Sequence, residues 1–348
     1  MAAELKLGLA LGYWFGDPPV GVADQLAVAE ELGFDSAWTA EAYGSDCFTP
    51  LAWYGARTTK LRLGTAVCQV SARTPTATAM TALTLDHLSE GRMMLGLGAS
   101  GPQVVEGWYG QPYPKPLART REYVEVVRRV LARQEPLQYE GEHYRMPNTD
   151  PGTTGLGKAL KSITHPRRSD LPILLGAEGP KNVALTAEIA DGWLPIFLSP
   201  KMDGFYRRCL AEGFARPGAR RTVDDFEVPN PVNVVIDDDV EKAADTVRFF
   251  LGFYIGGMGA REVNFHADVF ARMGYEAEVR KIQDLFLDGR QDEAVAAVPL
   301  ALVEDVALVG PLDKIRGELE AWRETLMTTM LVSGPPEHLR TVAELVWG

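Results

Sequence analysis

The sequence alternates apolar, strand-like segments with amphipathic, helix-like segments along most of its length. Residues 5–14 form a mostly apolar run that predicts a buried strand. Val22–Leu32 follows, with apolar residues at helical spacing and Gly33 directly after the last of them. Strands that alternate with helices predict a parallel sheet whose faces are covered by the helices. This alternation constrains the fold more than any other feature of the chain.

The same unit recurs along the sequence. We predict further strands at residues 35–41, 61–68, 93–97, 171–176, 193–198, 232–236, 263–265 and 329–332. We predict helices at residues 50–57, 75–88, 119–134, 181–190, 240–251, 275–287, 312–325 and 336–346. About eight such units in 348 residues favour a closed (β/α)8 barrel with insertions over an open sheet. We expect a single domain over residues 1–348, with a loop-like excursion at about 147–170.

The charge and the cysteine content of the chain limit the kinds of partner that such a barrel can bind. The formal net charge is −12, which argues against nucleic acid or an anionic membrane as a partner. No apolar run approaches the length of a transmembrane helix, and the start of the chain lacks the pattern of a signal peptide. The three cysteines are widely spaced and form no metal-binding motif, so we predict no metal site and a cytoplasmic protein.

The carboxyl ends of the strands carry the active site in barrels of this kind. Two glycine-containing segments fall there. Residues 96–101 (GLGASG) would let a flat ligand or a phosphate approach the backbone, or would simply form a tight turn. Residues 176–182 (GAEGPKN) open a helix and place a lysine at its start, which suits either an anion seat or a structural helix cap.

Candidates for acid–base chemistry are few. Glu41 ends a predicted strand and would serve as an acid, a base or a structural ion-pair partner. Cys68 would be reactive only with a lowered pKa and otherwise fills the core. His87 is predicted on a helix surface. Glycine-lined strand ends with so few polar catalysts favour an enzyme whose cofactor supplies the chemistry.

Several segments resemble the bacterial luciferase-like oxidoreductases that use the deazaflavin coenzyme F420. The similarity is carried by residues 61–77 (LRLGTAVCQVSARTPTA), 86–92 (DHLSEGR), 95–110 (LGLGASGPQVVEGWYG), 116–124 (PLARTREYV) and 176–195 (GAEGPKNVALTAEIADGWLP). The resemblance implies a TIM barrel of the luciferase-like type and a redox cofactor at its carboxyl-terminal face. It also implies a homodimer built through early barrel helices.

The resemblance further implies where the cofactor lies. A bulge after the third strand, with a cis non-proline peptide bond among Thr65, Ala66, Val67 and Cys68, would support the deazaflavin ring. The other implied cofactor-binding residues are Ala42, Gly98, Ala99, Ser100, Gly101, Gly176, Ala177, Gly179, Pro180, Lys181, Trp193 and Pro195. Among these, the segment 176–181 would hold a phosphate or diphosphate, and Trp193 with Pro195 would close the pocket.

These observations predict an F420-dependent oxidoreductase that transfers a hydride between the deazaflavin and a small organic substrate. Glu41 and Tyr13 are the candidates for the accompanying proton transfer. Two alternatives stay open: an FMN-dependent luciferase-like monooxygenase, and a non-catalytic barrel that only binds the cofactor.

Overall fold

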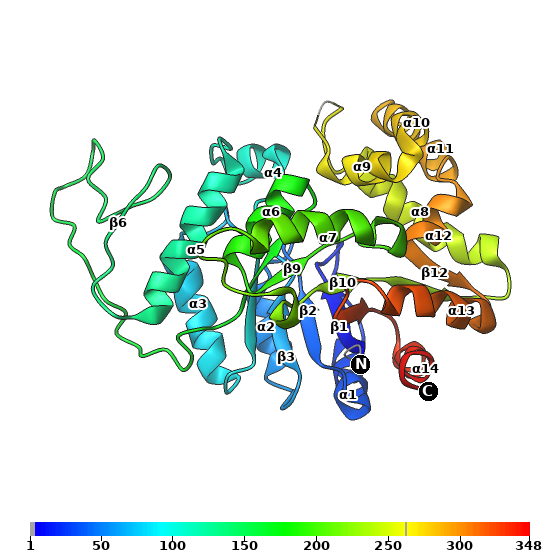
Figure 1. Ribbon diagram of the computed structural model, residues 1–348, viewed down its shortest axis with the longest axis horizontal. Coiled ribbons are helices and arrows are strands. Elements are labelled where there is room, and N and C mark those ends of the chain that lie inside the picture. Colours follow the sequence, from blue (N-terminus) through cyan, green and yellow to red (C-terminus); the bar gives the residue numbers. More distant parts are fainter. Residues whose placement is uncertain (1–3, 262) are drawn as a thin grey trace.

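A computed structural model describes residues 4–261 and 263–348 (Figure 1). Parallel strands form one continuous sheet in the order β10-β13-β1-β2-β3-β5-β8-β9, with the short β4 (Cys68–Gln69) also paired to β5. The eight principal strands are β1 Lys6–Gly12, β2 Ser36–Thr39, β3 Arg62–Thr65, β5 Met93–Gly98, β8 Ile173–Gly176, β9 Gly192–Leu194, β10 Pro229–Pro231 and β13 Thr329–Val332. Trp193 N–H donates to the Glu227 carbonyl across 2.8 Å, which joins β9 to the entry of β10 and closes the barrel.

Helices cover the outside of this barrel, as the sequence pattern predicts, and further helices of residues 240–306 group together at one side of it (Figure 1). They are α1 Val22–Leu32, α2 Phe48–Gly55, α3 Pro75–Leu88, α4 Pro102–Gly107, α5 Pro116–Ala132, α6 Pro180–Ile189, α7 Pro200–Phe214, α8 Val240–Gly256, α9 Phe265–Phe270, α10 Glu276–Leu287, α11 Gln291–Ala296, α12 Leu300–Val306, α13 Leu312–Arg323 and α14 Pro336–Trp347. A π-helical turn at Ala271–Tyr275 joins α9 to α10, and a 3-10 turn occupies Val223–Asp225. No helix within the described residues has both the length and the apolar character needed to cross a membrane.

Large apolar side chains and glycines fill the barrel interior together. The interior cluster contains Trp38, Met94, Leu174, Leu194 and Leu331, all nearly inaccessible to solvent. Trp38 lies against Gly64 on the next strand, where an added Cβ would meet the indole ring at 2.2 Å. The absence of a side chain at residue 64 therefore allows an indole to fit inside a barrel of this width.

Three expected strands differ from the structure. The predicted strand 61–68 divides into β3 and β4, because the chain bulges at Ala66 and Val67. The predicted strand 232–236 lies in a separate two-stranded sheet with β12 (Ala307–Gly310), as β11 (Asn233–Ile236), and Pro229–Pro231 takes the barrel position. The predicted strand 263–265 is wrong, because Asn264 caps α9 through its side-chain oxygen.

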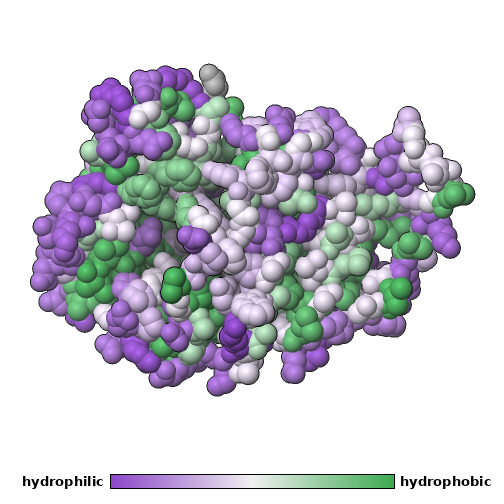
Figure 2. Space-filling view, turned by 180° about the vertical axis from the view of Figure 1, so that it is seen from behind, coloured by the Kyte–Doolittle hydropathy of each residue, from purple (hydrophilic) through white to green (hydrophobic). Residues whose placement is uncertain are grey.

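The expected excursion projects from the body of the molecule beside α3 and α5 (Figure 1). It follows a short hairpin, β6 (Tyr139–Glu140) and β7 (Arg145–Met146), and residues 147–170 contain no helix or strand. Leu156, Leu160 and Ile163 are exposed there, and Figure 2 shows hydrophobic side chains on this projection. Arg168, near the end of the excursion, pairs with the buried Asp86 carboxylate of α3 and so attaches the excursion to the barrel.

Candidate active site

The predicted site residues converge at one end of the barrel, because the carboxyl ends of parallel strands share one rim. Most strand residues are buried, whereas several residues at the ends of the strands or directly after them are half-buried. These half-buried positions are Tyr13, Ala42, Ala66, Val67, Ala99, Ser100, Gly101, Gly176, Glu178 and Gly179. The structure therefore brings the segments that sequence reasoning selected to a common, partly accessible surface.

A bulge after β3 forms part of this surface. The peptide bond between Ala66 and Val67 is cis, which confirms the feature that the resemblance implies. Val67 lies next to Gly98 and Gly176, where an added Cβ would meet its methyl groups at 2.4 and 3.1 Å. These two glycines thus make room for the valine side chain, a role that the sequence did not indicate. Thr65, below the bulge, is buried and holds β5 by exchanging hydrogen bonds with Gly96 at 2.8 and 2.9 Å.

Glu41 is tied to the same bulge. Its buried carboxylate accepts a hydrogen bond from the Gln69 amide at 2.9 Å and pairs with the Arg73 guanidinium at 2.7 Å. The Gln69 side chain returns to the Glu41 carbonyl oxygen at 3.1 Å. These contacts link the end of β2 to the segment after the cis peptide bond, so the geometry favours a positioning role for Glu41.

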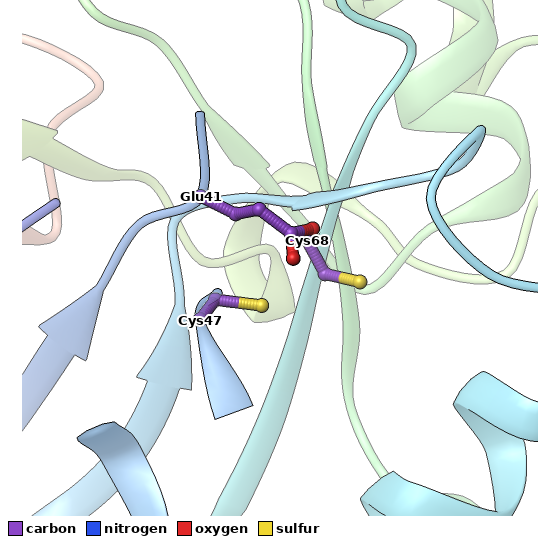
Figure 3. Close-up of side chains that lie close together, drawn as sticks. All are labelled: Glu41, Cys47 and Cys68. Atoms are coloured by element: carbon purple, nitrogen blue, oxygen red, sulfur yellow. The ribbon is translucent and has the colours of Figure 1, made fainter. Parts of the chain in front are cut away.

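Two cysteines complete this cluster, although they lie 21 positions apart and match no metal-binding motif. Ligand atoms of Glu41, Cys47 and Cys68 lie within 4.8 Å of one another, and all three residues are buried (Figure 3). Contact with Cys68 and burial raise the pKa of the Cys47 thiol, which keeps it neutral. Arg73 contacts Glu41 and also lies 3.7 Å from the Cys68 sulfur. Because the guanidinium already balances the carboxylate, the cluster fits an ion pair beside two thiols better than a cation site.

The turn after β8 leads into α6, at the place where the sequence predicts an anion seat. Gly179 caps the helix, and the space around its missing Cβ is open. Lys181 is exposed in the first turn of α6, where backbone N–H groups and the helix dipole favour a negative charge. Trp193 and Pro195 are buried, and the Trp193 indole donates to the Ala177 carbonyl at 2.7 Å. Trp193 therefore supports the turn from within the core.

The loop after β5 is held in an unusual conformation. Ser100 has a positive φ of 59°, a region that residues with a side chain seldom adopt. The Tyr113 hydroxyl donates to the Ser100 carbonyl at 2.8 Å, and burial raises the pKa of Tyr113 to about 12, so the phenol stays protonated. Tyr109 similarly donates to the Ala42 carbonyl at 3.3 Å. Two tyrosines thus fix the loops that follow β5 and β2.

The rim also carries a histidine–carboxylate pair that the sequence analysis did not predict. His266 Nδ1 lies 2.8 Å from a carboxylate oxygen of Glu178, although the two residues are 88 positions apart. The segment around Glu178 is predicted as an anion seat because of its glycines, and His266 is noted only because it follows a predicted strand. One sequence feature could have indicated Glu178 as a site residue: it closely follows a strand that ends at the rim.

The segment 86–92 belongs to the opposite end of the barrel and has a structural role. Arg92 donates to the Leu61 carbonyl at 2.6 Å and to the Thr58 hydroxyl at 2.9 Å. Asp86 pairs with Arg168 as described above. His87 is on the surface of α3, as predicted, and its Nε2 lies 2.8 Å from the His165 carbonyl oxygen. This segment therefore contributes to the resemblance through packing and not through chemistry.

Residues 14–329 match the protein family described as luciferase-like monooxygenase. The chain belongs to this family. Among its relatives is a Mycobacterium tuberculosis protein whose provisional name describes it as a coenzyme F420-dependent oxidoreductase; the two are 59% identical over 99% of this chain and 100% of the relative. As a member of the luciferase-like family, the chain is an oxidoreductase built on a TIM barrel.

Solved structures of low sequence identity have the same fold. Coenzyme F420-dependent tetrahydromethanopterin reductase from Methanopyrus kandleri superposes with a TM-score of 0.78 at 24% identity, covering 98% of each chain. An F420-dependent secondary alcohol dehydrogenase, solved with an F420–acetone adduct, gives 0.77 at 17% identity and the same coverage. The luciferase-like barrel therefore extends over nearly the whole chain.

Proposed function

We propose that this protein is an F420-dependent oxidoreductase that transfers a hydride between the deazaflavin and a small organic substrate. The observation that carries the proposal is the pairing of an apolar, half-buried bulge at Ala66–Val67 with an open helix N-terminus at Gly179 on the same rim. The provisional name of the Mycobacterium tuberculosis relative, at 59% identity, supports F420 over FMN.

The residues present fit such a cofactor by their chemistry. Ala66 and Val67 offer an apolar surface to an aromatic ring, and the backbone of residues 99–101 is accessible beside it. The N-terminus of α6, with Gly179, Pro180 and Lys181, offers N–H groups and a cation to a phosphate. When bound, the deazaflavin would supply or accept the hydride.

The protein's own contribution is orientation and control of protons. Glu41, Gln69 and Arg73 hold the bulge on which the ring would lie. Tyr13 lies half-buried after β1, and burial raises its pKa, so that its hydroxyl stays protonated at neutral pH and can donate a hydrogen bond. Exclusion of water over the ring would prevent loss of the hydride to solvent.

Fluorescence titration of the purified protein with F420 and, in parallel, with FMN tests the proposal. We expect micromolar binding of F420 and binding of FMN at least tenfold weaker, which is about 1.4 kcal/mol. Reduced F420 should then be oxidised in the presence of a member of a panel of ketones, enones and imines. Preference for FMN together with oxygen consumption would favour the monooxygenase alternative. Binding of F420 without turnover of any substrate would favour a non-catalytic carrier.

We also propose that the protein is a homodimer formed through α2 and α3. A groove between these helices carries large apolar side chains that are strongly exposed: Trp53 by 65%, Met80 by 61% and Leu88 by 74%. An apolar surface of this kind on a barrel exterior is typical of a protein interface. The expected homodimer is built through early barrel helices, and α2 and α3 are the second and third helices of the barrel.

Sedimentation velocity tests the dimer. The wild-type chain should sediment as a dimer of the 38.1 kDa protomer, and Trp53→Glu combined with Leu88→Glu should shift it to the monomer. The matched control is Phe249→Glu, which changes an equally exposed aromatic residue (70%) on α8. A wild-type monomer, or a dimer that the control disrupts equally, would contradict the proposed interface.

A further inference from the structure

The pair formed by His266 and Glu178 joins two parts of the fold at the barrel rim. Glu178 follows β8, and His266 lies in α9. His266 Nδ1 and Glu178 Oε1 are 2.8 Å apart, while Glu178 Oε2 is buried and has no hydrogen-bond partner among the described residues. The side chains are only 25% and 12% exposed. A buried carboxylate with a free oxygen beside an imidazole is costly unless the imidazole carries positive charge.

Aromatic rings hold the imidazole in place. Tyr254 of α8 and Phe197, after β9, meet the His266 ring edge-on at centroid distances of 4.9 and 6.2 Å. With Nδ1 directed at Glu178, the opposite ring nitrogen, Nε2, makes no hydrogen bond to any residue in the ranges 4–261 and 263–348. The fixed orientation leaves Nε2 as the atom that is able to exchange a proton with a ligand.

Titratable groups face the pair from α7, α8 and the turn after α9, and Tyr206 of α7 lies near both Glu178 and Arg272. Tyr254 faces His266 from α8, and the Tyr254 and Tyr13 hydroxyls lie close enough to affect each other's ionisation. Arg272, which follows α9, donates to the Glu178 backbone carbonyl at 3.2 Å. Tyr254 thus lies beside both Tyr13, after β1, and the His266 ring, and Glu178 closely follows β8, so the pair lies on the same rim as the bulge.

We propose that His266, oriented by Glu178, is the proton donor and acceptor for the hydride transfer, with Nε2 as the reacting atom. This inference rests on the proposed function and takes carbonyl compounds and the corresponding alcohols as its substrate class, because a carbonyl oxygen needs a proton once its carbon has accepted a hydride. In the reducing direction reduced F420 would supply the hydride that forms the new C–H bond at the carbonyl carbon, and the C=O π electrons would move to oxygen. That oxygen takes the proton from Nε2, leaving a neutral imidazole whose Nδ1–H stays bonded to Glu178.

The ionisation of His266 is consistent with this role. Burial lowers the pKa of the imidazole, but the charge of Glu178 and its hydrogen bond outweigh burial, so the pKa is raised above its usual 6.5. The proton is therefore present at pH values below the raised pKa, and it is lost as the pH rises through that pKa. Reduction should accordingly slow at alkaline pH, and alcohol oxidation should slow at acid pH.

Imidazole NMR on the cofactor-free protein tests the pair directly. The His266 resonance, assigned by its loss in His266→Gln, should titrate above pH 6.5, and in Glu178→Gln its midpoint should fall below that of the wild type because burial then acts alone. A His266 midpoint that Glu178→Gln leaves unchanged would overturn the pairing, whatever the cofactor proves to be.

Kinetics with reduced F420 and a panel of simple ketones tests the role in catalysis. His266→Gln should lower kcat about 100-fold and abolish the alkaline limb of the pH profile, while F420 affinity stays within a few-fold. His87→Gln, on the surface of α3, is the matched control and should leave both kcat and the pH profile unchanged. If His266→Gln turns over ketones as fast as the wild type does, this proposal is wrong and the proposed function stands. Failure of the wild type to bind F420 contradicts the proposed function and this proposal with it, whereas F420-dependent reduction of enones or imines but of no ketone contradicts this proposal alone.

Discussion

Replacing Arg73 by methionine should lower the free energy of unfolding by about 3 kcal/mol, because it leaves a buried carboxylate without its cation. Glu41 is only 4% exposed at its side chain, and its remaining partner would be the Gln69 amide. The substitution should also weaken F420 binding about tenfold, since Glu41 holds the segment that follows the cis peptide bond. Urea unfolding and fluorescence titration measure the two effects.

The second substitution at this pair separates charge from packing. Glu41→Gln added to Arg73→Met removes the unpaired charge and keeps the hydrogen bond from Gln69, so the double variant should regain about half of the lost stability. Arg290→Met is the matched control, because Arg290 pairs with Glu293 on the surface, where solvent screens the pair, and its loss should lower the free energy of unfolding far less. If Glu41→Gln alone stops turnover while stability and F420 affinity are unaltered, Glu41 acts in proton transfer and the positioning role is wrong.

Replacing Gly98 by alanine should weaken F420 binding at least tenfold and lower the free energy of unfolding by about 2 kcal/mol, the usual cost of overpacking. An added Cβ would lie 2.4 Å from a methyl group of Val67, so it must displace the side chain of the bulge. The same substitution at Gly107, whose surroundings are open, should change neither quantity. Titration with F420 and urea unfolding again provide the measurements.

A compensating substitution makes this second prediction specific. Val67→Ala removes the methyl group that the new Cβ would meet, so Gly98→Ala combined with Val67→Ala should bind F420 better than Gly98→Ala alone. Rescue of this kind requires that the two side chains compete for one space. Equal losses in the single and double variants would show that Gly98 serves another purpose, such as direct contact between its backbone and the ligand.

Local sequence patterns were sufficient for most of the scaffold. The helices Val22–Leu32 and Pro75–Leu88 and the strand Thr329–Val332 have the predicted limits. Residues close in sequence define these elements: Gly33 ends α1 in a left-handed conformation, and the Thr74 hydroxyl accepts the Ala77 amide at the start of α3. The repetition of strand and helix then leaves a parallel barrel as the arrangement that buries both faces of the strands.

Tertiary contacts decided the parts of the candidate site that the sequence did not reveal. Glu41 meets Arg73 and Cys68, and His266 meets Glu178, only because separate strand ends converge on one rim. The barrel position of Pro229–Pro231, where the sequence favours residues 232–236, is likewise set by pairing with β13. The sequence by itself determined the elements, the barrel and the rim segments, because periodicity and capping are local. Pairing of charges across the rim, the role of Gly98 and the orientation of His266 depend on distances between segments far apart in the chain, and only the folded barrel fixes those distances.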